Sequence, residues 1–323
     1  MPRHTMRAGV SALLLAAFTL AIAGDPSVPT GGSRWGADYF PDVPLTTHEG
    51  KLVRFYDDLL KDKVVAVDLI YTHCQYSCPL ETARMAQVQR MLGDRVGTDV
   101  FFYSITLDPA RDTPEVLSAY ARKFGAGKGW LFLTGRPEDI KLVSKKLGLA
   151  SERPVPNADG HTPDLMIGDV KAGQWMRNSA VDNPRFIATQ IERLLDGWKA
   201  PASKRSYSEA PRLSFTKGQY LFATRCAACH TIGRGDRIGP DLLGVTTTRD
   251  HGWLTRFIAR PDEVLASGDP IARALNAKYD RVTMPNLALG EADVAALVEY
   301  LGAARAADVQ GPSAAASTEA PAP

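Results

Sequence analysis

The pattern of apolar and polar residues divides the chain into two blocks. In the first, residues 35–198, short apolar runs that suit buried strands alternate with segments whose apolar residues recur at helical spacing. The predicted strands are 64–71, 100–107 and 130–133, a hairpin is predicted at DLMIGD and QWMRNSA, and helices are predicted from Pro79, Thr113, Pro137 and about Asn183. This alternation predicts a three-layer α/β domain.

The second block, residues 213–304, carries no comparable strand pattern. Helical spacing of apolar residues is found at 217–226, 252–261 and 291–301. The block is therefore predicted to be a small all-α domain that follows the α/β domain.

The segments outside the two blocks have other compositions. Residues 25–34 and 199–212 are rich in Pro, Ser and other turn residues and are predicted linkers, and the tail 305–323 is predicted to be disordered. Residues 1–24 place two arginines before an apolar run, as in a secretory signal peptide, or in an uncleaved N-terminal anchor. We therefore expect export to the periplasm, with membrane attachment only through this segment.

Charge and cysteine content narrow the possible functions. The chain of 323 residues has a net charge of only +2 and no basic stripe with interleaved aromatics, so nucleic acid is not an expected partner. Its 4 cysteines form two pairs at short local spacing, and a disulfide at such a spacing would constrain little of the chain. Both pairs are thus expected to carry chemistry.

The second pair lies in CAACH, which is the attachment signature of c-type haem. Cys226 and Cys229 would bond the two vinyl groups of one porphyrin, and His230 would be the proximal iron ligand. A redox dithiol or a chance spacing is the alternative. Met284, the only methionine after residue 200, is the predicted sixth ligand, and His251 is its rival.

This block resembles class I cytochrome c domains, because CAACH is followed by IGPDLLG at 238–244 and by MPN before a C-terminal helix. The resemblance implies that the carbonyl group of Pro240 holds the proximal imidazole. It also implies His/Met ligation and transfer of one electron at a time. Contacts between the first and last helices are implied as well, and they involve Gly218, Phe222, Leu297 and Tyr300.

The first pair lies in YTHCQYSCPL, where a buried strand is predicted to give way to a helix. Cys74 would follow the strand, and Cys78 would lie at the helix N-terminus, where the thiol pKa is lowered. Two converging thiolates suit Cu(I), but the same pair could form a disulfide. His161, in the loop NADGHTPDLMIGD, is the candidate third ligand.

The first block resembles the Sco/SenC family, through YTHCQYSCPLETA, SITLDPARDTPEVLSAYARKF and the later histidine before DLMIGD. The resemblance runs from about Pro44 to Trp198. It implies a thioredoxin fold and copper ligands at Cys74, Cys78 and His161. It also implies a partner, either the copper-site subunit of cytochrome c oxidase or another cuproprotein.

One residue departs from the family pattern, since Gln75 stands where many members have proline after the first cysteine. This bears on the rigidity of the loop and on copper affinity. Loop organisation or packing, rather than ligation, is expected of other residues near these motifs: His73, Asp108, Arg111, Met166 and Met176.

The leading interpretation is a periplasmic copper chaperone for the binuclear copper site of cytochrome c oxidase. Its haem c would exchange single electrons with the copper site or with a redox partner. One alternative is a thiol:disulfide oxidoreductase that acts on oxidase cysteines through Cys74 and Cys78. Another is an electron-transfer module whose first domain only docks a partner. Beyond the thiols no nucleophile–base pair is evident, which favours a metallochaperone or electron-transfer protein over a turnover enzyme.

Overall fold

The computed structural model describes residues 35–150, 162–197 and 214–304. The predicted signal segment with its linker, the linker 199–212 and the tail 305–323 lie outside the described residues, and their boundaries stay predictions. Within the described ranges, no helix has both the length and the apolar character needed to cross a membrane.

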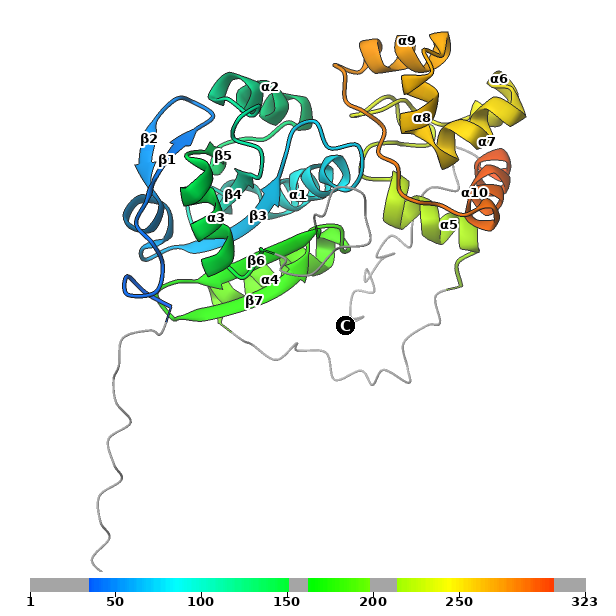
Figure 1. The fold of residues 1–323 in the computed structure, drawn as a ribbon. Coiled ribbons are helices and arrows are strands. Elements are labelled where there is room, and N and C mark those ends of the chain that lie inside the picture. The colour runs from blue at the N-terminus through cyan, green and yellow to red at the C-terminus, as the bar shows by residue number, and fades with distance from the viewer. Residues whose placement is uncertain (1–34, 151–161, 198–213, 305–323) are drawn as a thin grey trace, which may run out of the picture. The chain divides into compact units, whose positions relative to one another are not determined.

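A mixed sheet forms the centre of the first domain (Figure 1). Its seven described strands are ordered β2-β1-β5-β4-β3-β6-β7. β3 pairs in parallel with β4, and β4 with β5, whereas the other neighbours are antiparallel. The strand bounds are β1 Pro44–Thr47, β2 Leu52–Arg54, β3 Val64–Ile70, β4 Val100–Thr106, β5 Trp130–Thr134, β6 Asp164–Asp169 and β7 Gln174–Ser179.

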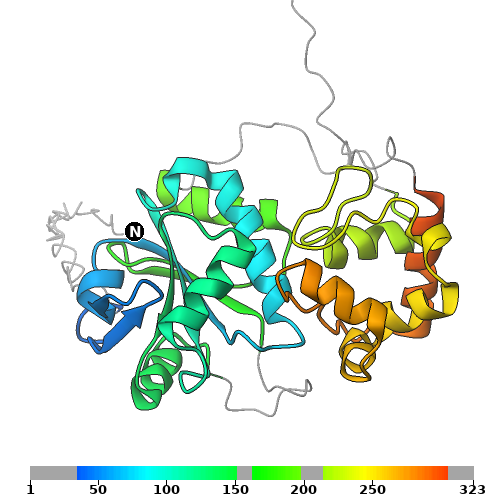
Figure 2. The same ribbon diagram turned by 90° about the horizontal axis from the view of Figure 1, so that it is seen from above.

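Helices cover both faces of this sheet (Figures 1 and 2). The even positions of β3, such as Ala66 and Ile70, pack in one core with α1, α2 and α4, and the odd positions pack in a second core with η1 and α3. The helical segments are η1 Phe55–Leu60, α1 Cys78–Leu92, η2 Gly93–Arg95, α2 Pro114–Phe124, α3 Pro137–Lys146 and α4 Pro184–Asp196. Strand alternation thus separates the two cores.

The predicted three-layer, thioredoxin-like α/β domain is confirmed. The sequence pattern missed β1 and β2, because strands of four and three residues are too short to give a periodic signal. The predicted strand 64–71 includes one acidic residue, Asp68, and the structure buries its side chain, which is only 3% exposed.

The second domain is built from short helices, as predicted. They are α5 Lys217–Leu221, η4 Phe222–Cys226, α6 Val245–Thr248, α7 His251–Ala259, α8 Pro261–Ala266, α9 Pro270–Lys278 and α10 Glu291–Ala303. The patterns predicted the segments around α5, α7 and α10, whereas α6, α8 and α9, which bury at most one residue each, were missed.

The first and last helices of this domain contact each other closely. A Cβ atom at Gly218 would lie 2.0 Å from the carbonyl oxygen of Ala296, so only glycine permits this approach. The rings of Phe222 and Tyr300 lie 5.8 Å apart between centroids, and Leu297 packs in the same core. The expected packing of the two helices is therefore present.

Candidate functional site

The first cysteine pair lies where β3 leads into α1. Cys74 follows the strand, and Cys78 is the first residue of α1, with Pro79 in the first turn. The two side chains are buried, with exposures of 3% and 0%. The strand and the helix thus bring two thiols together at one buried point.

The two thiols differ electrostatically. A hydrogen bond with the Cys78 thiol lowers the pKa of Cys74, and the N–H of Tyr76 donates to the Cys74 Sγ at 3.4 Å. For Cys78 the lowered pKa expected at a helix N-terminus is wrong, because burial raises its pKa well above the usual value and the hydrogen bond with Cys74 acts in the same direction. Cys74 is therefore the thiol that loses its proton first.

Asp112 anchors the start of the cysteine loop, and sequence reasoning missed this residue. Its fully buried carboxylate accepts from the N–H of Thr72 at 3.1 Å, from the Thr72 hydroxyl at 2.6 Å and from the Thr106 hydroxyl at 2.5 Å. Thr72 lies two residues before Cys74. The LDPARDT stretch did contain the signal, since it offers a second aspartate four positions after Asp108.

The polar residues expected to organise this loop do contact one another. Asp108 accepts from Arg111 Nε at 2.7 Å, and His73 Nε2 lies 3.4 Å from the same carboxylate oxygen. Gln75 is exposed beside Cys74.

The predicted third copper ligand, His161, lies outside the described residues. Among the residues that are described, no group of three or more His, Cys, Asp and Glu side chains could hold a metal ion. Met166 and Met176 lie on β6 and β7 and pack against the two cores of the first domain. A site that includes His161 stays a prediction.

The second cysteine pair lines a cavity of the all-α domain. Cys226, Cys229 and His230 line this cavity, and so does Met284, which comes from a segment far along the chain. Most of the other lining residues are apolar, among them Leu254, Phe257, Leu297 and Leu301. The rival ligand His251 is exposed at the start of α7 and is not among the lining residues.

A backbone carbonyl group orients His230, the predicted proximal ligand. His230 Nδ1 lies 2.9 Å from the carbonyl oxygen of Pro240, which fixes Nδ1 as the donor and leaves Nε2 with a free lone pair. A Cβ at Gly239 would come within 2.6 Å of His230 Cε1, so glycine is needed for this approach. Burial lowers the pKa of His230, which keeps the imidazole neutral and able to bind a metal.

The residues of this cavity fit a haem group. Burial raises the pKa of Cys226 to about 12 and that of Cys229 to about 11, so both sulfurs stay neutral thiols in an apolar wall. A neutral imidazole and a thioether face a cavity with apolar walls, as His/Met ligation of a haem iron requires.

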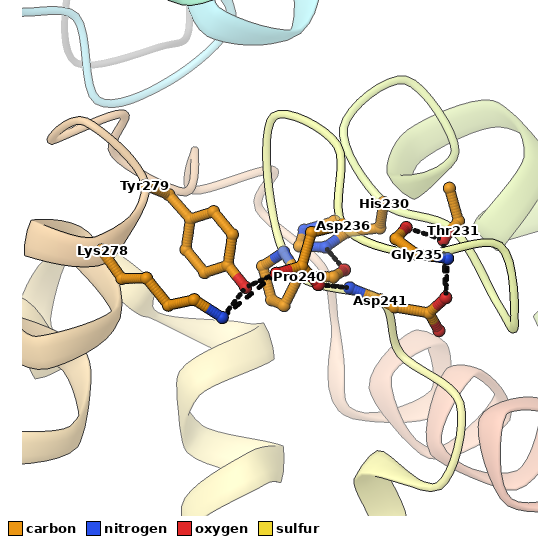
Figure 3. Close-up of polar contacts among 8 residues, drawn as sticks. All are labelled: His230, Thr231, Gly235, Asp236, Pro240, Asp241, Lys278 and Tyr279. Atoms are coloured by element: carbon orange, nitrogen blue, oxygen red, sulfur yellow. Dashed lines mark hydrogen bonds and ion pairs between the residues drawn. The ribbon is translucent and has the colours of Figure 1, made fainter.

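A second missed residue, Asp241, holds the loop behind His230 (Figure 3). Its carboxylate accepts from three consecutive backbone N–H groups, those of Gly233, Arg234 and Gly235, at 2.6 to 2.8 Å. It also accepts from the Thr231 hydroxyl and from the N–H of Leu243. Burial opposes ionisation of Asp241, but these hydrogen bonds keep its pKa below the usual range.

Comparison with known proteins assigns both parts of the chain. The SCO1/SenC family model matches residues 34–196, and the Cytochrome c family model matches residues 215–304. A SCO2-like protein of Rickettsia felis is 28% identical over 146 residues, which are 45% of this chain and 66% of that protein. The chain thus spans slightly less than two thirds of this relative.

Two solved structures are similar to the first domain. A SCO1/SenC family lipoprotein from Bacillus anthracis has 30% sequence identity and a TM-score of 0.41, covering 50% of this chain and 98% of its own. ScoI of Bradyrhizobium japonicum with copper bound has 28% identity and a TM-score of 0.39, covering 47% and 98%. Because the family model matches half of its length, the chain belongs to the SCO1/SenC family, and it carries a cytochrome c domain after the family's α/β domain.

Proposed function

We propose that the chain is an exported copper-binding protein that supplies copper to the binuclear site of cytochrome c oxidase, or to another cuproprotein. The observation that carries the proposal is the buried pair of cysteines, Cys74 and Cys78, at the junction of β3 and α1 in a member of the SCO1/SenC family. Copper is here the cargo, and the oxidase copper-site subunit is the proposed recipient.

The thiol pair supports copper as the metal. Thiolates are soft ligands that select Cu(I), and an added imidazole allows Cu(II) as well. Cys74 and Cys78 supply the sulfur ligands, and His161 supplies the imidazole. Asp112 positions Cys74 by fixing Thr72, so the loop needs little rearrangement when the metal binds.

We also propose that the second domain carries a covalent haem c. Cys226 and Cys229 would hold it through thioether bonds, with His230 and Met284 as axial ligands. When bound, the haem supplies a one-electron couple for the copper site or for a redox partner protein. The chain's own residues orient the imidazole through Pro240 and exclude water with the apolar walls of the cavity.

One observation favours a second function. The hydrogen bond between the Cys74 and Cys78 thiols brings the sulfurs close enough to suggest a reversible disulfide. The chain would then be a thiol:disulfide oxidoreductase that acts on oxidase cysteines, and His161 would have no part in its activity.

Copper titration of the full chain distinguishes these functions. We expect one copper per chain, measured by metal analysis and by electron paramagnetic resonance of Cu(II). His161→Ala should lower the affinity by more than about tenfold, since loss of even an outer-shell partner of a metal ligand costs about that much. His251→Ala, which changes an exposed histidine, is the matched control. Binding that does not depend on His161, together with a readily cycled disulfide, would favour the thiol oxidoreductase.

A further inference from the structure

Asp236 joins two segments of the cytochrome c domain that are distant in sequence (Figure 3). One carboxylate oxygen, Oδ1, accepts from the backbone N–H of Asp241 at 2.9 Å. The other, Oδ2, accepts from the Tyr279 hydroxyl at 2.7 Å and from Lys278 Nζ at 3.1 Å. Asp236 therefore contacts the loop that follows His230 on one side and the end of α9 on the other.

On the first side, the contact lies close to the proximal ligand. Asp241 directly follows Pro240, whose carbonyl group accepts from His230 Nδ1. The carboxylate of Asp241 accepts hydrogen bonds from three N–H groups of the preceding loop, so this loop behaves as one hydrogen-bonded unit. A shift of Asp236 would be transmitted through Asp241 to Pro240.

On the second side, the contact lies at the start of a strained turn. Tyr279 directly follows α9, and the next two residues, Asp280 and Arg281, have φ values of 51° and 58°, which non-glycine residues rarely adopt. The turn is closed by hydrogen bonds from Arg281 N–H to Asn276 and from Val282 N–H to Tyr279. Met284 follows two residues after Val282.

The two segments that Asp236 joins thus lie next to the two predicted axial ligands, His230 and Met284. Tyr279, Met284 and His230 line the same cavity. The hydrogen bonds from Asp241 N–H and the Tyr279 hydroxyl lower the pKa of Asp236 to about 2, so the carboxylate is ionised and a strong acceptor at neutral pH.

We propose that the Asp236–Tyr279 hydrogen bond is a positioning contact that ties the His230 loop to the turn before Met284, and so determines how firmly Met284 is held as the sixth iron ligand. The inference rests on the proposed haem attachment. Neither residue is a ligand, and both act through the backbone that presents one.

The test uses the full-length protein with its haem and measures the affinity of the ferric haem for added imidazole, which competes with Met284. Tyr279→Phe removes only the hydroxyl, and Asp236→Asn removes the charge. We expect each to raise imidazole affinity about three- to tenfold, the effect of one partly exposed charge-assisted hydrogen bond. The double variant should gain little more than the larger single effect.

Matched controls separate this role from a general surface effect. Tyr220→Phe alters a tyrosine that is 58% exposed, and Glu299→Gln alters an exposed carboxylate of α10. Both should bind imidazole within about twofold of the wild type. The methionine–iron charge-transfer band should weaken at a lower temperature in the Tyr279 and Asp236 variants, but not in the controls.

Two results would count against the inference in different ways. If no haem absorbance stays with the wild-type polypeptide after denaturation, the haem is not covalently bound. The proposed attachment then fails together with this inference. If haem is present and Tyr279→Phe and Asp236→Asn bind imidazole like the controls, the positioning role alone is wrong.

Discussion

Asp112 accepts hydrogen bonds from both the backbone N–H and the hydroxyl of Thr72, although 40 positions separate the two residues. This fixes the backbone two residues before Cys74. We therefore predict that Asp112→Ala, which leaves buried donors without an acceptor, lowers the free energy of unfolding by about 3 kcal/mol. It should also weaken copper binding, because the loop that carries Cys74 is released.

Urea unfolding and copper titration of the same variants check this prediction. Glu115→Gln is the control, since Glu115 is an exposed acidic residue nearby on α2. Asp112→Asn should give a smaller loss, because its amide keeps one acceptor oxygen. Wild-type copper affinity in Asp112→Ala would mean that Thr72 does not position the cysteine loop.

The distance along the chain explains which parts of the sites could be predicted. Cys74 with Cys78, and Cys226 with His230, lie within five consecutive positions, so their chemistry is visible in the sequence. Asp112 was missed because its partner Thr72 is brought close only by the parallel pairing of β3 and β4. The contact of Asp236 with Tyr279, 43 positions away, was missed because only the packing of the second domain brings the two residues together.

The helices and strands also divide into those that the sequence predicted and those that it missed. Long apolar runs predicted β3, β4 and β5 almost to the residue, because a buried strand needs apolar side chains on both faces. The short strands β1 and β2 and the helices α6, α8 and α9 bury only a few side chains each. Their position depends on the neighbours they pack against, and no local pattern encodes it.

Gly218 provides a steric test of the helix contact in the cytochrome c domain. A Cβ here would lie 2.0 Å from the carbonyl oxygen of Ala296 and 2.6 Å from Tyr300 Cβ, so α5 would have to move away from α10. We predict that Gly218→Ala lowers the free energy of unfolding by about 3 kcal/mol. Thermal unfolding of both variants measures this. Gly302→Ala is the control: the nearest atom to its added Cβ would lie at 3.6 Å, so it should be neutral or slightly stabilising.

Gly239 provides a test of the proposed role of His230 as proximal haem ligand. Its Cβ would meet His230 Cε1 at 2.6 Å, so Gly239→Ala should push the imidazole away from the Pro240 carbonyl group. We expect less covalent haem per chain and a shifted haem spectrum, both read from visible absorbance. Gly290→Ala, whose nearest atom lies at 3.9 Å, is the control. Equal haem content and identical spectra in both variants would contradict the prediction.

Asp68 makes the stability of the first domain depend on pH. Burial raises the pKa of this carboxyl to about 6 from 3.8, and Oδ2 has no hydrogen-bond partner among the described residues. The folded state thus binds the proton more tightly than the unfolded state, so the stabilisation is complete below about pH 4 and is lost as the pH rises through about 6.

Asp68→Asn cannot ionise, so it should be more stable than the wild type by up to about 3 kcal/mol at pH 7. That advantage should be absent at pH 4, and urea unfolding at the two pH values measures it. Ser104→Ala is the control: it removes the hydrogen bond to the carboxyl and the acceptor of the Trp130 indole N–H, but it keeps the titrating group, so its stability should still fall as the pH rises. An advantage of Asp68→Asn that is equal at pH 4 and pH 7 would mean that ionisation of Asp68 does not destabilise the fold.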